Sequence, residues 1–210
     1  MSNYPAHSSQ ELDSVLGVVA KPQTYQNIAY LLLSFPLGIL YFVLLVTGIS
    51  LGVSLAIVWI GIPILIGVLM LSRMFANLER QLASKFLNLE IPNADIATHG
   101  NLWQRAKTLV SNPITYAEMF YLFSKFVMGI LSFTLVVSLL ATSLGLIVTP
   151  LFWDQWGWDV GIPGVWEVDS FSKAAATSVV GAILGVASLH FLNGLAFVYG
   201  EYTKAILERS

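Results

Sequence analysis

The chain has 210 residues, of which 56% are hydrophobic and only 10% are charged, and its formal net charge is −2. A soluble domain usually carries about 25% charged residues, so we expect most of the outer surface to face lipid. The near-neutral charge argues against a nucleic-acid partner. Because there is no cysteine, disulfides, thiolate metal sites and a cysteine nucleophile are excluded. The composition therefore predicts an integral membrane protein.

The first apolar region runs from residue 28 to residue 72, and its 45 residues include no Asp, Glu, Lys or Arg. As one straight helix it would be about 67 Å long, whereas the hydrocarbon core of a bilayer is about 30 Å thick. The region must therefore turn back on itself, and the glycines within 47–52 mark the expected turn. We predict transmembrane helices near 28–48 and 52–73.

Apolar residues continue at helical spacing from Phe75 to Leu89, with basic residues beside them. This pattern predicts an amphipathic helix along the inner membrane surface, ended by Pro92, and a second short helix is expected at 101–110. The two helices either act as a scaffold between hairpins or bind a partner protein. The candidate partner surface consists of Arg73, Glu79, Arg80, Phe86, Trp103 and Arg105.

Two further charge-free regions follow, at 126–153 and 174–200, which raises the number of predicted transmembrane helices to four. The third helix is expected to begin near Thr115, because Thr115 and Glu118 have the spacing of a capping box. The sequence thus indicates an all-α membrane protein.

The basic residues predict how the chain is oriented in the cell membrane. Five Lys and Arg residues lie between the second and third predicted spans, whereas Lys173 is the only one on the opposite side. Cytoplasmic loops carry the excess of Lys and Arg. We therefore expect a multi-pass protein with both termini cytoplasmic, including a polar N-terminal segment at 1–21 and a connector at 93–112.

An internal repeat relates the two halves. Residues 22–46 align without a gap to residues 113–137, and 12 of these 25 positions are identical at an offset of 91. The identities include Pro, Thr, Tyr and Gly, which chance similarity between apolar helices would rarely match. Each copy holds two spans, so both copies enter the membrane in the same direction. We predict two parallel tandem helical hairpins, at 22–92 and 113–210, related by a pseudo-twofold axis along the membrane normal.

The second hairpin carries an expected external loop at 150–172 that is rich in tryptophan and acidic residues. Aromatic residues with acidic neighbours can bind a cationic ligand, although interfacial anchoring or contact with a partner protein would also explain them. The candidate sensing loop consists of Trp153, Asp154, Trp156, Trp158, Asp159 and Trp166.

A few polar or small residues interrupt the apolar spans. Lys125 is expected to snorkel to the cytoplasmic interface or to pair with Glu118 or Glu201. Helix packing, within the chain or in a homodimer, is the expected role of a GxxxG pair and two polar residues, which are Gly181, Gly185, His190 and Asn193. We find no catalytic, metal-binding or cofactor-binding pattern and no pair of buried carboxylates, so we expect neither an enzyme nor a proton-coupled transporter.

Several short motifs follow one another in the first half, namely Phe35-Pro-Leu-Gly38, Glu79-Arg80 and Ile91-Pro92. Their order resembles the putative sensor domain family of bacteria and archaea, over about residues 22–205. Members of that family often stand at the N-terminus of histidine kinases and related signalling proteins. The resemblance implies a sensory input module, and because we expect no kinase region after the fourth span, any signal would have to pass through a separate protein.

We therefore expect a membrane-embedded sensor or regulator that acts through a separate cytoplasmic or membrane partner, such as a kinase, a regulator or a larger complex. The alternative is an accessory structural subunit of a larger membrane protein complex. A small transporter or lipid-handling enzyme would need polar groups at the midplane, where only His190 and Asn193 are expected.

Overall fold

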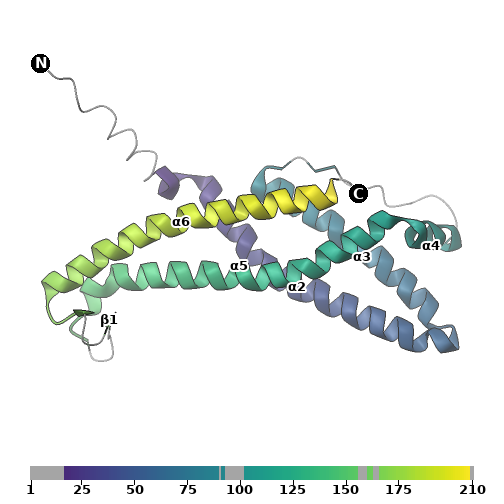
Figure 1. Ribbon diagram of the computed structural model, residues 1–210, viewed down its shortest axis with the longest axis horizontal. Helices are drawn as coiled ribbons and strands as arrows, with labels where there is room; N and C mark the ends of the chain where they lie inside the picture. The colour runs from purple at the N-terminus through teal and green to yellow at the C-terminus, as the bar shows by residue number, and fades with distance from the viewer. Residues whose placement is uncertain (1–16, 90, 93–101, 156–159, 163–165, 209–210) are drawn as a thin grey trace, which may run out of the picture. The chain divides into compact units, whose positions relative to one another are not determined.

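The computed structural model describes residues 17–89, 91–92, 102–155, 160–162 and 166–208 (Figure 1). In this part of the chain, four helices are long and apolar enough to cross a membrane. They are α2 (Pro22–Leu55), α3 (Gly61–Leu87), α5 (Pro113–Phe152) and α6 (Phe171–Leu207). The short elements are η1 (Ala56–Val58), α4 (Leu102–Ser111) and the antiparallel pair of strands β1 (Gly161–Ile162) and β2 (Trp166–Glu167). The expected all-α class with four apolar helices is confirmed.

The turn between α2 and α3 lies beyond the predicted 47–52. Helix α2 continues to Leu55, and the chain reverses through η1 and Trp59, whose φ of 65° is in the left-handed region. Gly61 starts α3 so close to α2 that a Cβ there would overlap the Gly52 carbonyl oxygen. The turn therefore depends on Gly61.

The two glycines that suggested a turn lie inside α2 and allow α3 to approach. A Cβ at Gly48 would lie 2.5 Å from Val68 Cγ2, and one at Gly52 would lie 2.6 Å from Leu65 Cδ2. Both glycines therefore mark the interface of the α2–α3 hairpin, which small residues commonly form in membrane helices. This corrects the predicted helix boundaries.

The start of α5 also differs from the prediction. Asn112, not Thr115, caps the helix, because its Oδ1 accepts the Ile114 backbone N–H at 3.0 Å. Both residues of the predicted capping box lie within α5. Thr115 and Glu118 are instead fully buried and are used in tertiary contacts.

The chain divides into two compact units, one made of residues 1–25 and 134–194, the other of 26–133 and 195–210. In the first unit α5 and α6 lie side by side (Figure 1). A Cβ at Gly181 would lie 2.7 Å from Leu146 Cβ, and Ser178 Oγ donates to the Ile147 carbonyl at 2.8 Å. Close backbone approach at a small residue thus joins the two helices.

In the second unit α2 crosses α5 through two glycines. A Cβ at Gly38 would lie 2.7 Å from the Lys125 carbonyl oxygen, and a Cβ at Gly129 would overlap the Ser34 carbonyl oxygen. The two contacts are exchanged when 91 is added to the α2 residue number and subtracted from the α5 residue number, because Gly38 then becomes Gly129 and Lys125 becomes Ser34. The stacked rings Phe35–Phe133 and Phe42–Phe126, with centroids 4.5 Å and 4.4 Å apart, are exchanged by the same shift.

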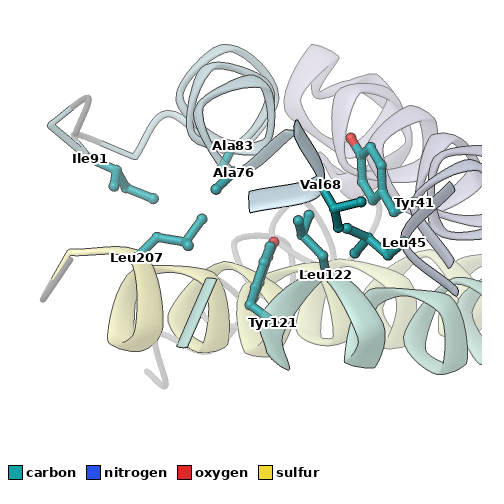
Figure 2. Packing of buried hydrophobic residues seen from close by; sticks show 9 residues of the cluster. All are labelled: Tyr41, Leu45, Val68, Ala76, Ala83, Ile91, Tyr121, Leu122 and Leu207. Atoms are coloured by element: carbon teal, nitrogen blue, oxygen red, sulfur yellow. The ribbon is translucent and has the colours of Figure 1, made fainter. Parts of the chain in front are cut away.

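The hydrophobic core of the second unit draws on α2, α3, α5 and α6. Figure 2 shows Tyr121 and Leu122 of α5 near Leu45 of α2 and Val68 of α3. Burial of such side chains contributes roughly 1.5–3 kcal/mol each in water, and in lipid close packing replaces much of that gain. The cluster comprises Tyr41, Leu45, Val68, Ala76, Ala83, Ile91, Tyr121, Leu122 and Leu207.

Replacing Gly129 by alanine should weaken the α2–α5 crossing. The new Cβ would collide with backbone atoms of Ser34 and Phe35, which cannot rotate away, so we expect a loss of about 1–3 kcal/mol in the free energy of unfolding. Equilibrium unfolding in detergent micelles measures this. Gly145→Ala on the same helix is the matched control, because a Cβ there meets nothing within 4 Å. Equal stability of the two variants would contradict the crossing.

Candidate functional site

A network of buried charged and hydroxyl side chains lies inside the second unit, and we call it the buried network. Its charged members are almost completely inaccessible, with Arg73 at 6% exposure and the others at 0–1%. It takes residues from all four long helices. Its members are Tyr30, Tyr41, Arg73, Glu79, Arg80, Thr115, Glu118, Tyr121, Lys125 and Thr203.

Helical spacing brings these residues together. On α5, Glu118, Tyr121 and Lys125 are three and four residues apart and therefore share one face. On α3, Arg73 and Arg80 are seven residues apart, two turns along one face. The two faces meet because the buried Ala76 and Ala83 of α3 join the same core as Tyr121.

Glu79 is the centre of one half of the buried network. Its Oε1 accepts a hydrogen bond from the Tyr41 hydroxyl at 3.0 Å, and its Oε2 accepts one from the Tyr121 hydroxyl at 3.1 Å. Lys125 Nζ lies 2.8 Å from the same Oε2. One carboxylate is thus held by a cation and two phenols, which compensates for its removal from water.

The hydrogen bonds around Glu79 close into a ring. Lys125 Nζ donates to the Tyr30 hydroxyl at 2.7 Å, and that hydroxyl lies 3.5 Å from Thr203 Oγ1. Thr203 Oγ1 lies 3.0 Å from the Tyr121 hydroxyl, which donates to Glu79. The Lys125–Glu79 ion pair completes the ring. Each of the four long helices contributes at least one member, so a shift of any helix would stretch a hydrogen bond.

Glu118 is the centre of the other half. Arg80 Nη2 donates to its Oε1 at 2.8 Å, and Arg73 Nε lies 3.5 Å from its Oε2. Arg73 Nη2 also donates to Thr115 Oγ1 at 3.3 Å, and Arg80 Nη2 reaches the Leu207 carbonyl at 3.3 Å. The two arginines therefore connect α3 to the start of α5 and to the end of α6.

The charges of the buried network nearly balance, with three cations and two carboxylates. An isolated buried charge costs several kcal/mol even after relaxation, and pairing offsets this only when the hydrogen-bond geometry is good. Ionisable groups inside membrane segments are rare for this reason and commonly mark functional sites. Among the described residues, no group of three or more His, Cys, Asp or Glu side chains could hold a metal ion.

The buried network corrects three predictions. Lys125 neither snorkels nor pairs with Glu118 or Glu201, because it is bound to Glu79. The chain does contain two buried carboxylates, Glu79 and Glu118. Arg73 and Arg80 of the predicted partner surface, together with Glu79, face the interior.

The remaining members of the predicted partner surface are Phe86, Trp103 and Arg105. Phe86 is half-buried in α3. The side chains of Trp103 and Arg105 lie outside the described part of the chain. The structure therefore does not gather these residues with the arginines into one exposed surface. A signal for the buried site was present in the sequence as the face shared by Glu118, Tyr121 and Lys125.

The structure describes only part of the predicted sensing loop. Trp153 is half-buried and Asp154 is exposed, whereas Trp156, Trp158 and Asp159 lie outside the described residues. Trp166 is exposed, and its indole N–H donates to Thr177 Oγ1 at 3.2 Å. Nearby, Lys173 donates to Asp169 at 2.8 Å, and this hydrogen bond holds the pKa of the Asp169 carboxyl below its usual range.

Of the four residues predicted to pack helices, three lie at helix contacts and one is exposed. Gly181 contacts α5 closely, and a Cβ at Gly185 would lie 3.7 Å from Ser143 Cβ. Asn193 Nδ2 donates to Thr24 Oγ1 at 3.0 Å, which joins α6 to the start of α2 within the first unit. The His190 side chain is exposed.

Four long apolar helices around a buried polar network define a multi-pass α-helical membrane protein. Residues 30–207 match the model of the family described as "Putative sensor", and the chain belongs to this family. The predicted resemblance is thereby confirmed, and the family is one of sensor domains, not an enzyme family. No curated protein and no solved structure matches the chain.

Removing one partner of the Lys125–Glu79 pair should be costly. We expect Glu79→Leu to lower the free energy of unfolding by about 3–5 kcal/mol, because it leaves a buried ammonium without its carboxylate. The double variant Glu79→Leu/Lys125→Met should lose at least about 1 kcal/mol less than the sum of the single variants. Equilibrium unfolding in detergent provides the three values. Glu201→Leu, at an exposed position of α6, should stay within about 0.5 kcal/mol of the parent. Strict additivity would contradict the pairing.

Proposed function

We propose that the chain is a membrane-embedded sensory or regulatory module in which the buried network changes between two arrangements and thereby alters a separate protein partner. The observation that carries this proposal is the ring closed by the Lys125–Glu79 pair, which joins α2, α3, α5 and α6. The family membership supports the sensory part of the proposal.

The energetics of the ring favour a switching role over simple packing. Well-packed apolar residues of similar size often stabilise a fold as well as a buried ion pair, so stability alone gives little reason to retain one. A polar network has discrete alternative hydrogen-bond arrangements, which a two-state switch requires. A stimulus that favours one arrangement by about 1–3 kcal/mol would change the ratio of the two arrangements about 5- to 150-fold.

We further infer that the two halves are tandem repeats of one helical hairpin, in a parallel arrangement. The sequence identity at an offset of 91 supports this, as do the glycine contacts and phenylalanine stacks that the same shift exchanges. The hydroxyl groups of Tyr25 and Tyr116, also 91 residues apart, donate to the carbonyls of Val19 and Val110, which are 91 apart as well.

The proposed orientation places both termini, α4 and the buried network toward the cytoplasm and the loop at 150–172 outside. The excess of Lys and Arg between α3 and α5 supports it. A stimulus would then act on the external loop or on the bilayer, and a kinase, a regulator or a larger membrane complex would respond on the inner side. An accessory structural subunit remains the competing function.

Single-cysteine labelling tests the orientation, and the chain's lack of cysteine makes it direct. We expect an impermeant maleimide added to intact cells to label Gln155→Cys but not Lys107→Cys, since both positions are exposed and lie at opposite ends of α5. Cell disruption should make Lys107→Cys reactive, which controls for accessibility. Labelling of Lys107→Cys in intact cells would overturn the orientation.

Photo-crosslinking combined with a mild ring variant tests the switch. Tyr121→Phe removes one hydroxyl of the ring and leaves every charge in place, so the protein should fold with a loss of only about 1–3 kcal/mol. A photoreactive residue at the exposed Lys85 or Lys107 should capture a defined protein from native membranes, and Tyr121→Phe should change the capture yield severalfold.

Tyr116→Phe is the matched control, because that hydroxyl binds only the nearby Val110 carbonyl among the hydrogen bonds described and is exposed. It should leave the capture yield unchanged. A partner captured equally by the parent and by Tyr121→Phe would identify a structural subunit. Capture of no protein at either position would contradict both functions.

A further inference from the structure

The crossing in the second unit defines the relative direction of α2 and α5. At one end of their contact, Ser132 Oγ donates to the Leu31 carbonyl at 3.0 Å. At the other end, the Phe42 and Phe123 rings have centroids 6.0 Å apart. Residue numbers therefore fall along α5 as they rise along α2. This register requires the two helix directions, each taken from N- to C-terminus, to diverge by more than a right angle.

The lengths of the two helices provide an independent observation. The 28 residues of α2 from Ile28 to Leu55 and the 27 residues of α5 from Phe126 to Phe152 carry no charged side chain. Each stretch is about 40 Å long, whereas the hydrocarbon core is about 30 Å thick. Such a stretch fits inside the core at a tilt of about 45°, compared with an average near 20° for transmembrane helices.

We propose that α2 and α5 lie in the bilayer at about 45° or more from the membrane normal, and that they pivot on the crossing where Gly38 meets the Lys125–Phe126 backbone and Gly129 meets the Ser34–Phe35 backbone as bilayer thickness changes. Two helices that enter from the same side and diverge by more than a right angle must have a mean tilt of more than about 45°. The inference rests on the proposed same-side orientation, but it does not depend on a protein partner. The stimulus in this proposal is the thickness of the acyl-chain layer of the bilayer.

The pivot is connected to the ring of the buried network. Gly38 and Gly129 contact the opposite backbone directly, and the stacked rings Phe35–Phe133 and Phe42–Phe126 flank them on either side of the crossing. Tyr30 of α2 and Lys125 of α5 are joined at 2.7 Å, two turns and one turn away from these glycines respectively. A change in crossing angle would act directly on that hydrogen bond. Bilayer thickness would therefore favour either the closed or the opened ring.

Polarised infrared dichroism in oriented bilayers, read at single ¹³C=¹⁸O-labelled carbonyls of the full chain, measures the tilts of α2 and of α5 separately. We expect a tilt of about 45° or more from the normal, and a value near the usual 20° would overturn the proposal. The reading does not depend on sidedness or on a partner. Failure of the orientation, seen by cysteine labelling, is thus distinguishable from failure of the tilt.

Distances between spin labels test the pivot. Val53→Cys follows the crossing on α2, and Phe120→Cys precedes it on α5. Both positions are exposed and lie within the same unit. Because the two helices run in opposed directions, both labels lie at the same end of the crossing. A smaller tilt in a thicker bilayer brings the N-to-C directions closer together and therefore opens the angle between the two labelled arms. Reconstitution in short-, medium- and long-chain phosphatidylcholine should thus lengthen the distance by several ångströms as the bilayer thickens. The pair Val53→Cys and Met74→Cys, both within the α2–α3 hairpin, should remain constant. An α2–α5 distance that is identical in all three lipids would overturn the pivot.

Discussion

The ion pair between Lys125 and Glu79 is the interaction on which the second unit depends. It places a cation and an anion where neither could remain alone, and it draws two further phenols and a threonine into one closed ring. Because the ring includes residues of all four long helices, a change in their mutual register must break or exchange at least one of its hydrogen bonds. The surrounding apolar core, the glycine crossing and the second carboxylate at Glu118 are compatible with that one register.

The sequence predicts the number and class of the helices well, because charge-free runs longer than a bilayer leave few alternatives. It predicts the position of the first turn poorly. Gly48 and Gly52 resemble a turn in the sequence, yet they let α3 approach α2, and the glycine that the reversal requires is Gly61. Close helix approach and chain reversal both select glycine, so residue type alone does not separate them.

The buried site was missed for a related reason. Arg73, Glu79 and Arg80 border an apolar stripe, which is also what a helix at the membrane surface would show. Their burial follows from partners on α5 and α6 that are distant in sequence, such as Glu118 and the Leu207 carbonyl. Polar spacing on α5 indicated a common face, but the identity of the opposite face is a tertiary property.

The substitution at one pair of corresponding positions has a consequence for how such a molecule can arise. In the proposed tandem repeat, positions 34 and 125 correspond under the shift of 91, and they carry serine in the first half and lysine in the second. An assembly of two identical hairpins would have to carry lysine at both positions or at neither, and two ammonium groups would compete for counterions near the crossing. Covalent linkage of the halves allows a single lysine away from the symmetry axis. The two halves of a fused pair can thus differ in charge, whereas the two copies in a homodimer of hairpins cannot.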